Sequence, residues 1–425
     1  MYDLAIVGGY VYQDGKFENT NVYCNGEKIV KVSAESYEAK KIIRANGKKV
    51  LPGLIDSHVH LKLNVGDFTS ADDFISGSKM AVLGGVTTVL DFLDPIWNNN
   101  ELDEVFAKRL RDSEKSLVDY GFHCTLANYQ GNVDYLISSA KEKGISSIKV
   151  FTTYSDSDRR CSNEVIKDVL KKNILLMAHC EKDELIYIAK NMAQYEDSRS
   201  EKAELEAIKE LSQYANGNGK LYVVHISSGN NLELLEKSEN IYFESCPQYF
   251  YLNKDLFRLK EGEKYLLAPP LRSSDSIELI KKNIDKLDVI GTDHCPFTLS
   301  EKLSSSPYSR IPKGIGTLGF AFQLMYELFG DKIIDKFTSN PARIFGLKNK
   351  GQIAEGFDGD FAIIDPKSST EIDISLSGCD YSPYENIKLN SRVITTIVRG
   401  TIVMDRATVF PHKGKYQRRE YESIN

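Results

Sequence analysis

Short apolar runs rich in β-branched residues alternate with amphipathic segments along most of the chain. In the helical segment EKAELEAIKELSQYA, the spacing of Leu205, Ile208 and Leu211 predicts one apolar stripe among charged residues. Regular alternation of strands and helices indicates a parallel sheet. Eight strands favour a closed (β/α)8 barrel over residues 51–349, and an open doubly wound sheet is the alternative. The eight runs are GLIDSHVH, VTTVLDF, GFHCTLA, ISSIKVF, ILLMAHC, KLYVVHI, IYFESC and DVIGTDH.

Both ends of the chain carry a different, turn-rich β pattern. The N-terminal end contains LAIVGGYVY and NVYCNGEKIVKVS, with turn signals at QDGK and Asn25-Gly26. Near the C-terminus, KGQIAEGFDGDFAIIDP and RVITTIVRGTIVMD have the same character. A chain of 425 residues also exceeds the usual size of one hydrophobic core. We therefore expect residues 1–50 and 350–425 to form one small β-sandwich domain beside an α/β barrel.

Composition narrows the functional class. The chain is 41% hydrophobic and 27% charged, as ordinary globular proteins are, and its net charge of -6 gives no reason to expect a nucleic-acid partner. No run approaches the ~20 apolar residues of a membrane-spanning helix, and the first residues lack the basic start of a signal peptide. The seven cysteines contain no Cys-x-x-Cys motif. These features predict a cytoplasmic protein with reduced thiols and no membrane partner.

Histidines gather at the ends of the predicted strands. His58 and His60 close the first strand, where a two-residue period turns both rings to one face. An isolated His-x-His is more often a hydrogen-bonded core pair. However, His179 and His225 also end strands, Asp293 ends the eighth, and barrels carry their reactive groups at these ends. Four imidazoles and one carboxylate predict a site for zinc or a similar divalent metal.

Lys149 lies in the middle of the apolar strand ISSIKVF. A lysine at such a position must reach water, pair with a charge or shift its pKa. One interpretation is a structural ion pair. The other is that the amine reacts with carbon dioxide to form a carbamate, an anionic ligand able to bridge two cations. The spacing of residues leaves both open.

The chain resembles the cyclic amidohydrolases of the amidohydrolase superfamily, and within them the hydantoinase and dihydropyrimidinase branch. The likeness covers nearly the whole length, and so many motifs in this order are highly specific. The motifs are LPGLIDSHVHL, TSADDF, GGVTTVLDF, IKVFTTY, AHCE, DSRSEKAELEAI, LYVVHISS, ESCPQYFYL, APPLR, GTDHCPF, NPARIFGL, GQIAEGFDGDFAIIDP and SPYE.

The resemblance implies a metal centre with two divalent ions, expected to be Zn²⁺. It assigns His58, His60 and Asp293 to one ion and His179 and His225 to the other. A carbamate on Lys149, derived from carbon dioxide, would bridge the two. The resemblance also implies a homo-oligomer, either a dimer or a tetramer.

The implied reaction is the opening of a small cyclic amide. Amide hydrolysis near neutral pH lacks a nucleophile, and a pair of divalent ions supplies a water of lowered pKa. Asp293 is the expected general base, which takes a proton and returns it to the leaving nitrogen. The hydroxyl of Tyr154 is expected to stabilise the oxyanion. A hydantoin or dihydropyrimidine would give an N-carbamoyl amino acid.

Two other functions stay open on the sequence. A dihydroorotase or allantoinase is the nearer, because Lys62 follows His60 where dihydroorotases carry an arginine for a substrate carboxylate. Against it stand ESCPQYF and GTDHCPF, which resemble the hydantoinase forms. The second is a non-catalytic scaffold related to dihydropyrimidinase. This chain keeps every ligand type, which favours an enzyme.

Substrate recognition departs from the family pattern at two positions. Ala268 occupies the place of a serine in APPLR, and Lys313 that of an asparagine in IPKGIG. With Tyr154 and Lys62, they are the candidate substrate-binding residues, and an inward-pointing Lys313 would favour an anionic substrate. Residues beside the ligands are expected to pack or support them rather than react: Cys180, His294 and Cys295.

Overall fold

The computed structural model describes residues 1–425 except 218, 305–309 and 421–425. Eight parallel strands form one sheet, and each pairs with the next along the chain. A parallel bridge between Val59 and His294 joins the first strand to the end of the last, where the His60 amide donates to the His294 carbonyl at 2.9 Å. This contact nearly closes a barrel, which confirms the predicted fold class and excludes the open sheet. The strands are β6 (Leu54–Val59), β9 (Val86–Phe92), β10 (Asp119–Thr125), β11 (Ser147–Phe151), β12 (Leu175–His179), β13 (Lys220–Val223), β14 (Ile241–Ser245) and β15 (Val289–Ile290).

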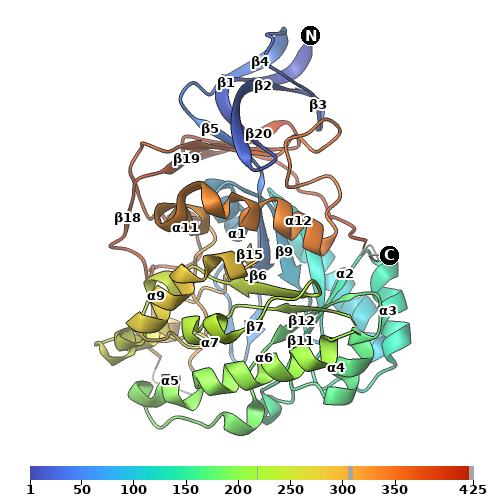
Figure 1. Cartoon of the computed structure of the whole chain (residues 1–425), viewed down its shortest axis with the longest axis vertical. Helices are drawn as coiled ribbons and strands as arrows, with labels where there is room; N and C mark the ends of the chain where they lie inside the picture. Colours follow the sequence, from blue (N-terminus) through green and yellow to red (C-terminus); the bar gives the residue numbers. More distant parts are fainter. Residues whose placement is uncertain (218, 305–309, 421–425) are drawn as a thin grey trace.

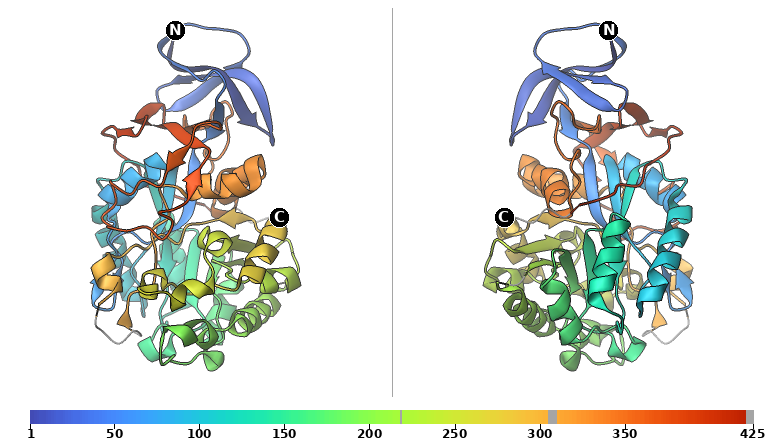
Figure 2. Two further views of the ribbon diagram at one scale, coloured as in Figure 1. Left: turned by 90° about the vertical axis from the view of Figure 1, so that its left-hand side faces the viewer. Right: turned by 90° about the vertical axis from the view of Figure 1, so that its right-hand side faces the viewer.

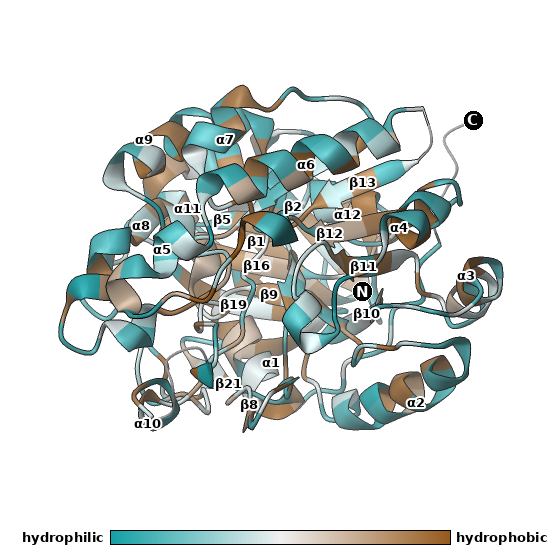
Figure 3. Cartoon of the chain, turned by 90° about the horizontal axis from the view of Figure 1, so that it is seen from below, coloured by the Kyte–Doolittle hydropathy of each residue, from teal (hydrophilic) through white to brown (hydrophobic). Residues whose placement is uncertain are grey.

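Helices surround this barrel (Figure 1). Figure 3 shows α2, α3, α6 and α9 at the outer edge of the view, with both hydrophilic and hydrophobic residues, as expected for helices with one buried face. In α6, Ile208 and Leu211 are buried as predicted, whereas Leu205 is half-buried and Ala203 and Ala207 complete the buried face. The helices are α1 (Phe74–Leu83), α2 (Leu102–Ser113), α3 (Val133–Glu142), α4 (Asn163–Leu170), α5 (Tyr195–Ser198), α6 (Glu201–Ala215), α7 (Gly229–Leu234), α8 (Gln248–Tyr251), α9 (Ser274–Lys282), α10 (Leu299–Lys302), α11 (Ala321–Phe329) and α12 (Ser339–Phe345).

A second sheet of nine strands combines both ends of the chain. Its two halves meet where β5 pairs antiparallel with β16, with Leu51 opposite Ala362. Figure 2 shows the N-terminal strands in blue at one end of the molecule, with the red C-terminal strands between them and the barrel. The strands are β1 (Tyr2–Gln13), β2 (Lys16–Asn25), β3 (Lys28–Ser33), β4 (Ala39–Arg44), β5 (Lys49–Pro52), β16 (Phe361–Asp365), β19 (Arg392–Val398), β20 (Thr401–Asp405) and β21 (Thr408–Val409).

The domain bounds 1–50 with 350–425, and 51–349, stay a prediction, and residues 421–425 lie outside the described part. The segment before them leaves the sheet and lies along the barrel. There the Tyr120 amide donates to the Lys415 carbonyl at 3.1 Å, and the buried Arg419 side chain donates to the Phe122 carbonyl. Two short hairpins complete the strands: β7 (Asn64–Val65) with β8 (Phe68–Thr69), and β17 (Thr370–Glu371) with β18 (Lys388–Leu389).

The described helices include none with the length and apolar character needed to cross a bilayer. All seven cysteines are buried, and none forms a disulfide.

A buried ionic cluster joins the barrel to the nine-stranded sheet. The Lys350 ammonium lies 2.7 Å from Asp119 at the start of β10, 2.6 Å from Asp360 and 3.0 Å from Asp358. Arg399, after β19, also bonds to Asp119. Lys350 is 2% exposed and Asp119 is fully buried. Each buried carboxylate is thus paired with a cation, and the three aspartates hold an amine rather than a metal.

Replacing Lys350 with Met should therefore destabilise the fold strongly. Removing one partner from a buried ion pair leaves uncompensated charge and costs about 3–5 kcal/mol. The matched control is Lys332→Met, because Lys332 forms an exposed pair with Asp285 and such pairs contribute about 1 kcal/mol or less. Denaturant unfolding measures both free energies. Equal, small losses in the two variants would contradict the role given to Lys350.

Candidate metal centre and active site

A cavity of about 700 Å³ opens at the C-terminal ends of the barrel strands. Nine of the ten candidate residues line it, namely His58, His60, Lys149, Tyr154, His179, His225, Ala268, Asp293 and Lys313. Lys62 is the exception. Its ammonium lies 2.8 Å from Asp112 and its side chain is 52% exposed, so the structure does not bring it to the site.

The three side chains that the sequence predicts to bind one ion, His58, His60 and Asp293, lie together and are named the first ligand group. Oδ1 of Asp293 lies 3.2 Å from Nε2 of His58 and 3.0 Å from Nε2 of His60. Burial alone would raise the pKa of the Asp293 carboxyl, but the two imidazoles outweigh it and hold this pKa well below its usual value. Burial also lowers the pKa of His60 to about 4. At neutral pH this group therefore offers an ionised oxygen and an unprotonated ring nitrogen.

His58 itself is held between two carboxylates. Burial opposes its protonation, but Glu244 and Asp293 outweigh burial and raise its pKa to about 9. A metal-free ring would thus carry a proton on the nitrogen that faces Asp293. A divalent cation at that nitrogen satisfies the same carboxylate, because it supplies the positive charge that the proton otherwise provides.

His179 and His225 form the second ligand group. Nδ1 of His179 and Nε2 of His225 lie 3.1 Å apart, and burial lowers the pKa of both rings. Two uncharged imidazoles thus direct nitrogens at one small volume. The ring centroids of His225 and His58 are 5.5 Å apart, so the two groups adjoin. Ligand atoms of His58, His225 and Asp293 all lie within 4.8 Å of one another.

Lys149 lies in the middle of β11 and lines the same cavity, where its charge acts on His60, His179 and His225. It is 3% exposed, and among the described residues no carboxylate lies within 4.0 Å of its amine. Its neighbours include the rings of Phe92 and Phe151, whose centroids are 5.6 Å and 5.5 Å from Nζ. Burial lowers the pKa of Lys149 to about 8. The geometry does not support a structural ion pair, and a lysine with a lowered pKa has more unprotonated amine available to react.

Glu244, on β14, supports both ligand groups from behind. Its Oε1 lies 2.7 Å from Nδ1 of His58 and accepts the His225 backbone amide at 3.0 Å, while the Tyr222 hydroxyl donates to Oε2 at 2.7 Å. The carboxylate is fully buried. By accepting from the outer nitrogen of His58, it leaves the inner nitrogen for a metal.

Glu181 has the same relation to His179. Its Oε2 lies 2.5 Å from Nε2 of His179, so Nδ1 of that ring is directed at His225. The Arg199 side chain bonds to both oxygens of Glu181 and holds the carboxylate in place. The roles of Glu181 and Glu244 were not predicted from the sequence. The available signal was an acidic residue inside the apolar runs AHCE and ESC.

Tyr154 follows β11 and faces the second ligand group. Its ring centroid lies 5.2 Å from that of His179, and the guanidinium carbon of Arg199 lies 4.8 Å from its ring. Its φ of 73° is in the left-handed region, which points to a side chain held in an unusual local turn. Burial raises the pKa of Tyr154 to about 12. The phenol therefore stays protonated at neutral pH and remains a hydrogen-bond donor.

The three residues beside the ligands are placed as supporting groups. Nε2 of His294 lies 2.9 Å from Asp72, and Nδ1 accepts the Thr317 amide at 3.0 Å. Both ring nitrogens are thus engaged outside the ligand groups. Burial raises the pKa of the Cys180 and Cys295 thiols, which argues against their acting as nucleophiles.

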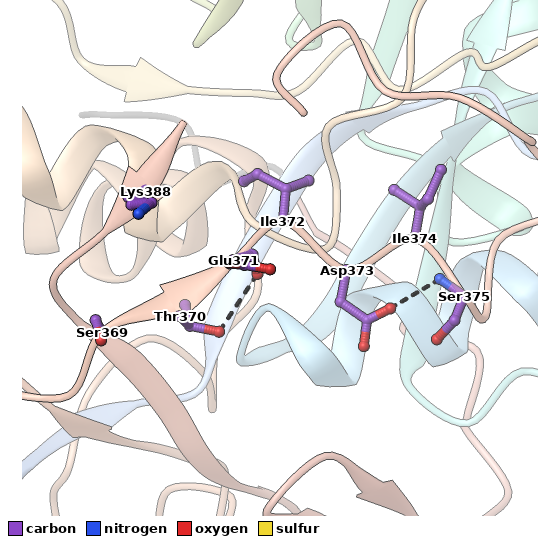
Figure 4. Close-up of a pocket in the computed structure, with 8 residues that line it drawn as sticks. All are labelled: Ser369, Thr370, Glu371, Ile372, Asp373, Ile374, Ser375 and Lys388. Carbon is purple, nitrogen blue, oxygen red and sulfur yellow. Dashed lines mark hydrogen bonds between the residues drawn. The ribbon is translucent and has the colours of Figure 1, made fainter. Parts of the chain in front are cut away.

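A second cavity, of about 840 Å³, lies beside β17 and β18 (Figure 4). Its lining consists of residues 369–375 and Lys388, and it includes no histidine, no cysteine and none of the candidate residues. Figure 4 shows Asp373 bonded to the amide of Ser375, a local contact within the segment. Of these two cavities, the one at the barrel mouth therefore contains the candidate catalytic and metal-binding residues.

A barrel whose strand ends carry histidines and an aspartate is the architecture of a metal-dependent hydrolase class, and comparison with known proteins agrees. Residues 49–403 match the model of the Amidohydrolase family, and the chain belongs to that family. A D-phenylhydantoinase of Escherichia coli strain SE11 is 31% identical over 414 residues, which cover 89% of each chain.

Solved structures give the same result. D-hydantoinase from Bacillus sp. AR9 superposes with a TM-score of 0.93 at 27% identity, covering 99% of this chain and 100% of that one. Dihydropyrimidinase from Brevibacillus agri NCHU1002 gives 0.90 at 26% identity, with 99% of both chains covered. These matches confirm the predicted likeness to the hydantoinase and dihydropyrimidinase branch.

Proposed function

We propose that this protein hydrolyses the ring amide of a hydantoin or dihydropyrimidine and releases an N-carbamoyl amino acid. One observation carries the proposal: two adjoining groups of candidate ligand side chains and a buried lysine line one cavity at the mouth of an amidohydrolase barrel. The similarity to D-phenylhydantoinase and dihydropyrimidinase supports this substrate class.

The residues present fit a centre of two divalent ions. His58, His60 and Asp293 would hold one ion, and His179 with His225 the other. Lys149 would bridge both as a carbamate, consistent with its burial and lowered pKa. Nitrogen and oxygen donors of this kind suit Zn²⁺. Such a pair supplies a water of lowered pKa and polarises a carbonyl oxygen.

Asp293 and Tyr154 carry the proton and charge chemistry. The ionised Asp293 accepts a proton from the attacking water and returns it to the ring nitrogen as the amide bond breaks. Tyr154 donates its hydroxyl to the carbonyl oxygen as negative charge develops there. Ala268 and Lys313 line the same cavity and are proposed to contact the ring or its substituent.

The alternatives are less well supported. A dihydroorotase would gain from a cation after His60, but Lys62 pairs with Asp112 and does not line the cavity. A non-catalytic scaffold would not require the pKa shifts seen here. Burial lowers the pKa of His60, as a metal ligand requires, and raises that of Tyr154, as a hydrogen-bond donor requires. We also propose a cytoplasmic homo-oligomer, a dimer or tetramer, on the resemblance of the motifs.

A panel of four substrates tests the proposed function. The zinc-loaded protein, prepared with bicarbonate, should open hydantoin or dihydrouracil to the N-carbamoyl product. Ring opening is followed by ultraviolet absorbance and by chromatography of the product. Turnover of dihydroorotate or allantoin, with none of hydantoin or dihydrouracil, would overturn the assignment.

Asp293→Asn should lower kcat strongly. An amide cannot accept the proton, and loss of a general base costs about 10²–10⁴-fold. Asp285→Asn, at an exposed pair with Lys332, is the matched control. Metal content and circular dichroism are measured beside the rate, which separates proton transfer from metal loss or unfolding. Substantial activity in a folded, metal-loaded Asp293→Asn protein would refute this role.

Glu244→Gln should weaken metal binding by about 10–100-fold, the usual effect of losing a group that orients a ligand. One amide oxygen cannot accept from His58, His225 and Tyr222 together. Competition with a chelator measures the affinity without reference to activity. Glu233→Gln, at an exposed pair with Lys282, is the control. Unchanged metal affinity in Glu244→Gln would show that the carboxylate does not orient these ligands.

A further inference from the structure

Arg159 and Lys313 line the cavity on the side of Tyr154, and neither takes part in the proposed proton transfer or oxyanion stabilisation. Arg159 comes five residues after Tyr154, and its backbone amide donates to the Tyr154 carbonyl at 3.0 Å. Lys313 reaches the same wall from the segment before α11. Both side chains are half-buried. The substrate-facing wall beside the oxyanion donor is therefore positively charged.

Neighbouring groups determine how much of this positive charge is neutralised. The guanidinium carbon of Arg199 lies 4.8 Å from the centre of the Tyr154 ring. The charge of Arg199 interacts with that of Lys313, and the charge of Arg159 interacts with the Tyr154 hydroxyl. Arg199 is neutralised by Glu181, which binds it through both oxygens. Arg159 has no carboxylate within 4.0 Å among the described residues. Its charge is therefore available to a ligand.

Lys313 is poorly solvated as a cation. Burial is the main reason that its pKa falls to about 8, and the charge of Arg199 lowers it further, while the exposed Asp156 opposes both. Its ammonium donates to the Ile311 carbonyl at 3.2 Å, which holds it at the wall. An anion brought into the cavity would restore the favourable interactions that burial removes.

Carboxylates on the cavity lining do not cancel this charge. Asp293 belongs to the metal ligands, and Asp183 accepts hydrogen bonds from Thr153 and Ser155. Asp67 and Asp156 are exposed at the rim. Asp183 is half-buried as well, but the Arg160 guanidinium lies 3.5 Å from its carboxylate and offsets its charge. Arg159 and Lys313 therefore give the Tyr154 side an excess of half-buried positive charge.

Apolar side chains also line the mouth of the cavity. Leu63 and Val65 lie on one side, and Tyr187 and Ile188, which are 53% and 74% exposed, lie in the segment before α5. The hydrocarbon surfaces of these side chains suit a short aliphatic arm. Arg159 and Lys313 then determine which chemical group is favoured at the far end of that arm.

We propose that Arg159 and Lys313 form a subsite for an anionic substituent, so that the preferred substrate is a cyclic amide with a short aliphatic arm ending in a carboxylate. This inference rests on the proposed ring-opening function and names its substrate class. The product would be an N-carbamoyl derivative of an acidic amino acid. A reaction that removes a carbamoyl group from such a compound would consume it.

Two hydantoins of equal size test the subsite. One carries a 2-carboxyethyl arm at ring position 5, and the other carries the uncharged 2-carbamoylethyl arm. The zinc-loaded protein should favour the carboxylate by at least about tenfold in kcat/KM, which corresponds to about 1.4 kcal/mol. This preference should shrink as salt increases, because the subsite opens to solvent.

Variants identify the residues responsible. Lys313→Met and Arg159→Met should each lower the ratio of the two kcat/KM values toward one, chiefly through KM for the carboxylate. Lys313→Arg should keep the ratio well above one, since the charge is retained. Lys62→Met is the discriminating control, because this lysine lies outside the cavity and its loss should leave the ratio as it is.

The outcomes separate the two proposals. If both hydantoins open at equal rates, or if neither Lys313→Met nor Arg159→Met changes the ratio, the anionic subsite is wrong and the ring-opening function stands. Loss of the preference in Lys62→Met would also overturn the subsite. If the metal-loaded protein opens neither of the two substituted hydantoins, nor hydantoin, nor dihydrouracil, both proposals fail.

Discussion

Contact between the first and last barrel strands is the constraint on which the site depends. The His60 amide donates to the His294 carbonyl at 2.9 Å, and this bond joins segments more than two hundred residues apart. It fixes His58 and His60 beside Asp293, whose oxygen lies near both rings. Without closure, the carboxylate that completes the first ligand group would lie at the opposite edge of an open sheet.

Burial then gives these side chains their chemical states. It lowers the pKa of His60 and Lys149 and raises that of Tyr154. At neutral pH the His60 ring is therefore unprotonated, the Lys149 amine gives up its proton more readily, and the phenol keeps its own. Glu244 and Glu181 oppose burial at His58 and His179 and fix which ring nitrogen faces inward. The same strands that close the barrel thus exclude water and orient the ligands.

Much of this arrangement could be predicted from the sequence. Period-two placement put His58 and His60 on one face, and the position of His179, His225 and Asp293 at strand ends follows from the barrel itself. The pairing of β5 with β16 follows the β pattern at both chain ends, although Leu205 in α6 is less buried than its spacing indicates.

Other features depend on contacts between distant segments. An acidic residue in an apolar run does not show which distant residue it contacts. The bond between Glu244 and His58 therefore could not be predicted from the local sequence pattern. Lys62 was placed by its proximity to His60 in sequence, but Asp112 in α2 draws its ammonium away. Nothing in the sequence around Arg159 indicated a role, because the role proposed for it depends on its position beside Tyr154 at the cavity wall.

The central claim is that six side chains jointly hold two cations, with Lys149 carrying a carboxyl group. Native mass spectrometry of the protein incubated with zinc and bicarbonate tests it most directly. We expect a mass that exceeds the bare chain by two zinc ions and one carboxyl group per subunit, with the carboxyl group localised to Lys149. A chain that stays at its unmodified mass and binds no zinc under these conditions would contradict it.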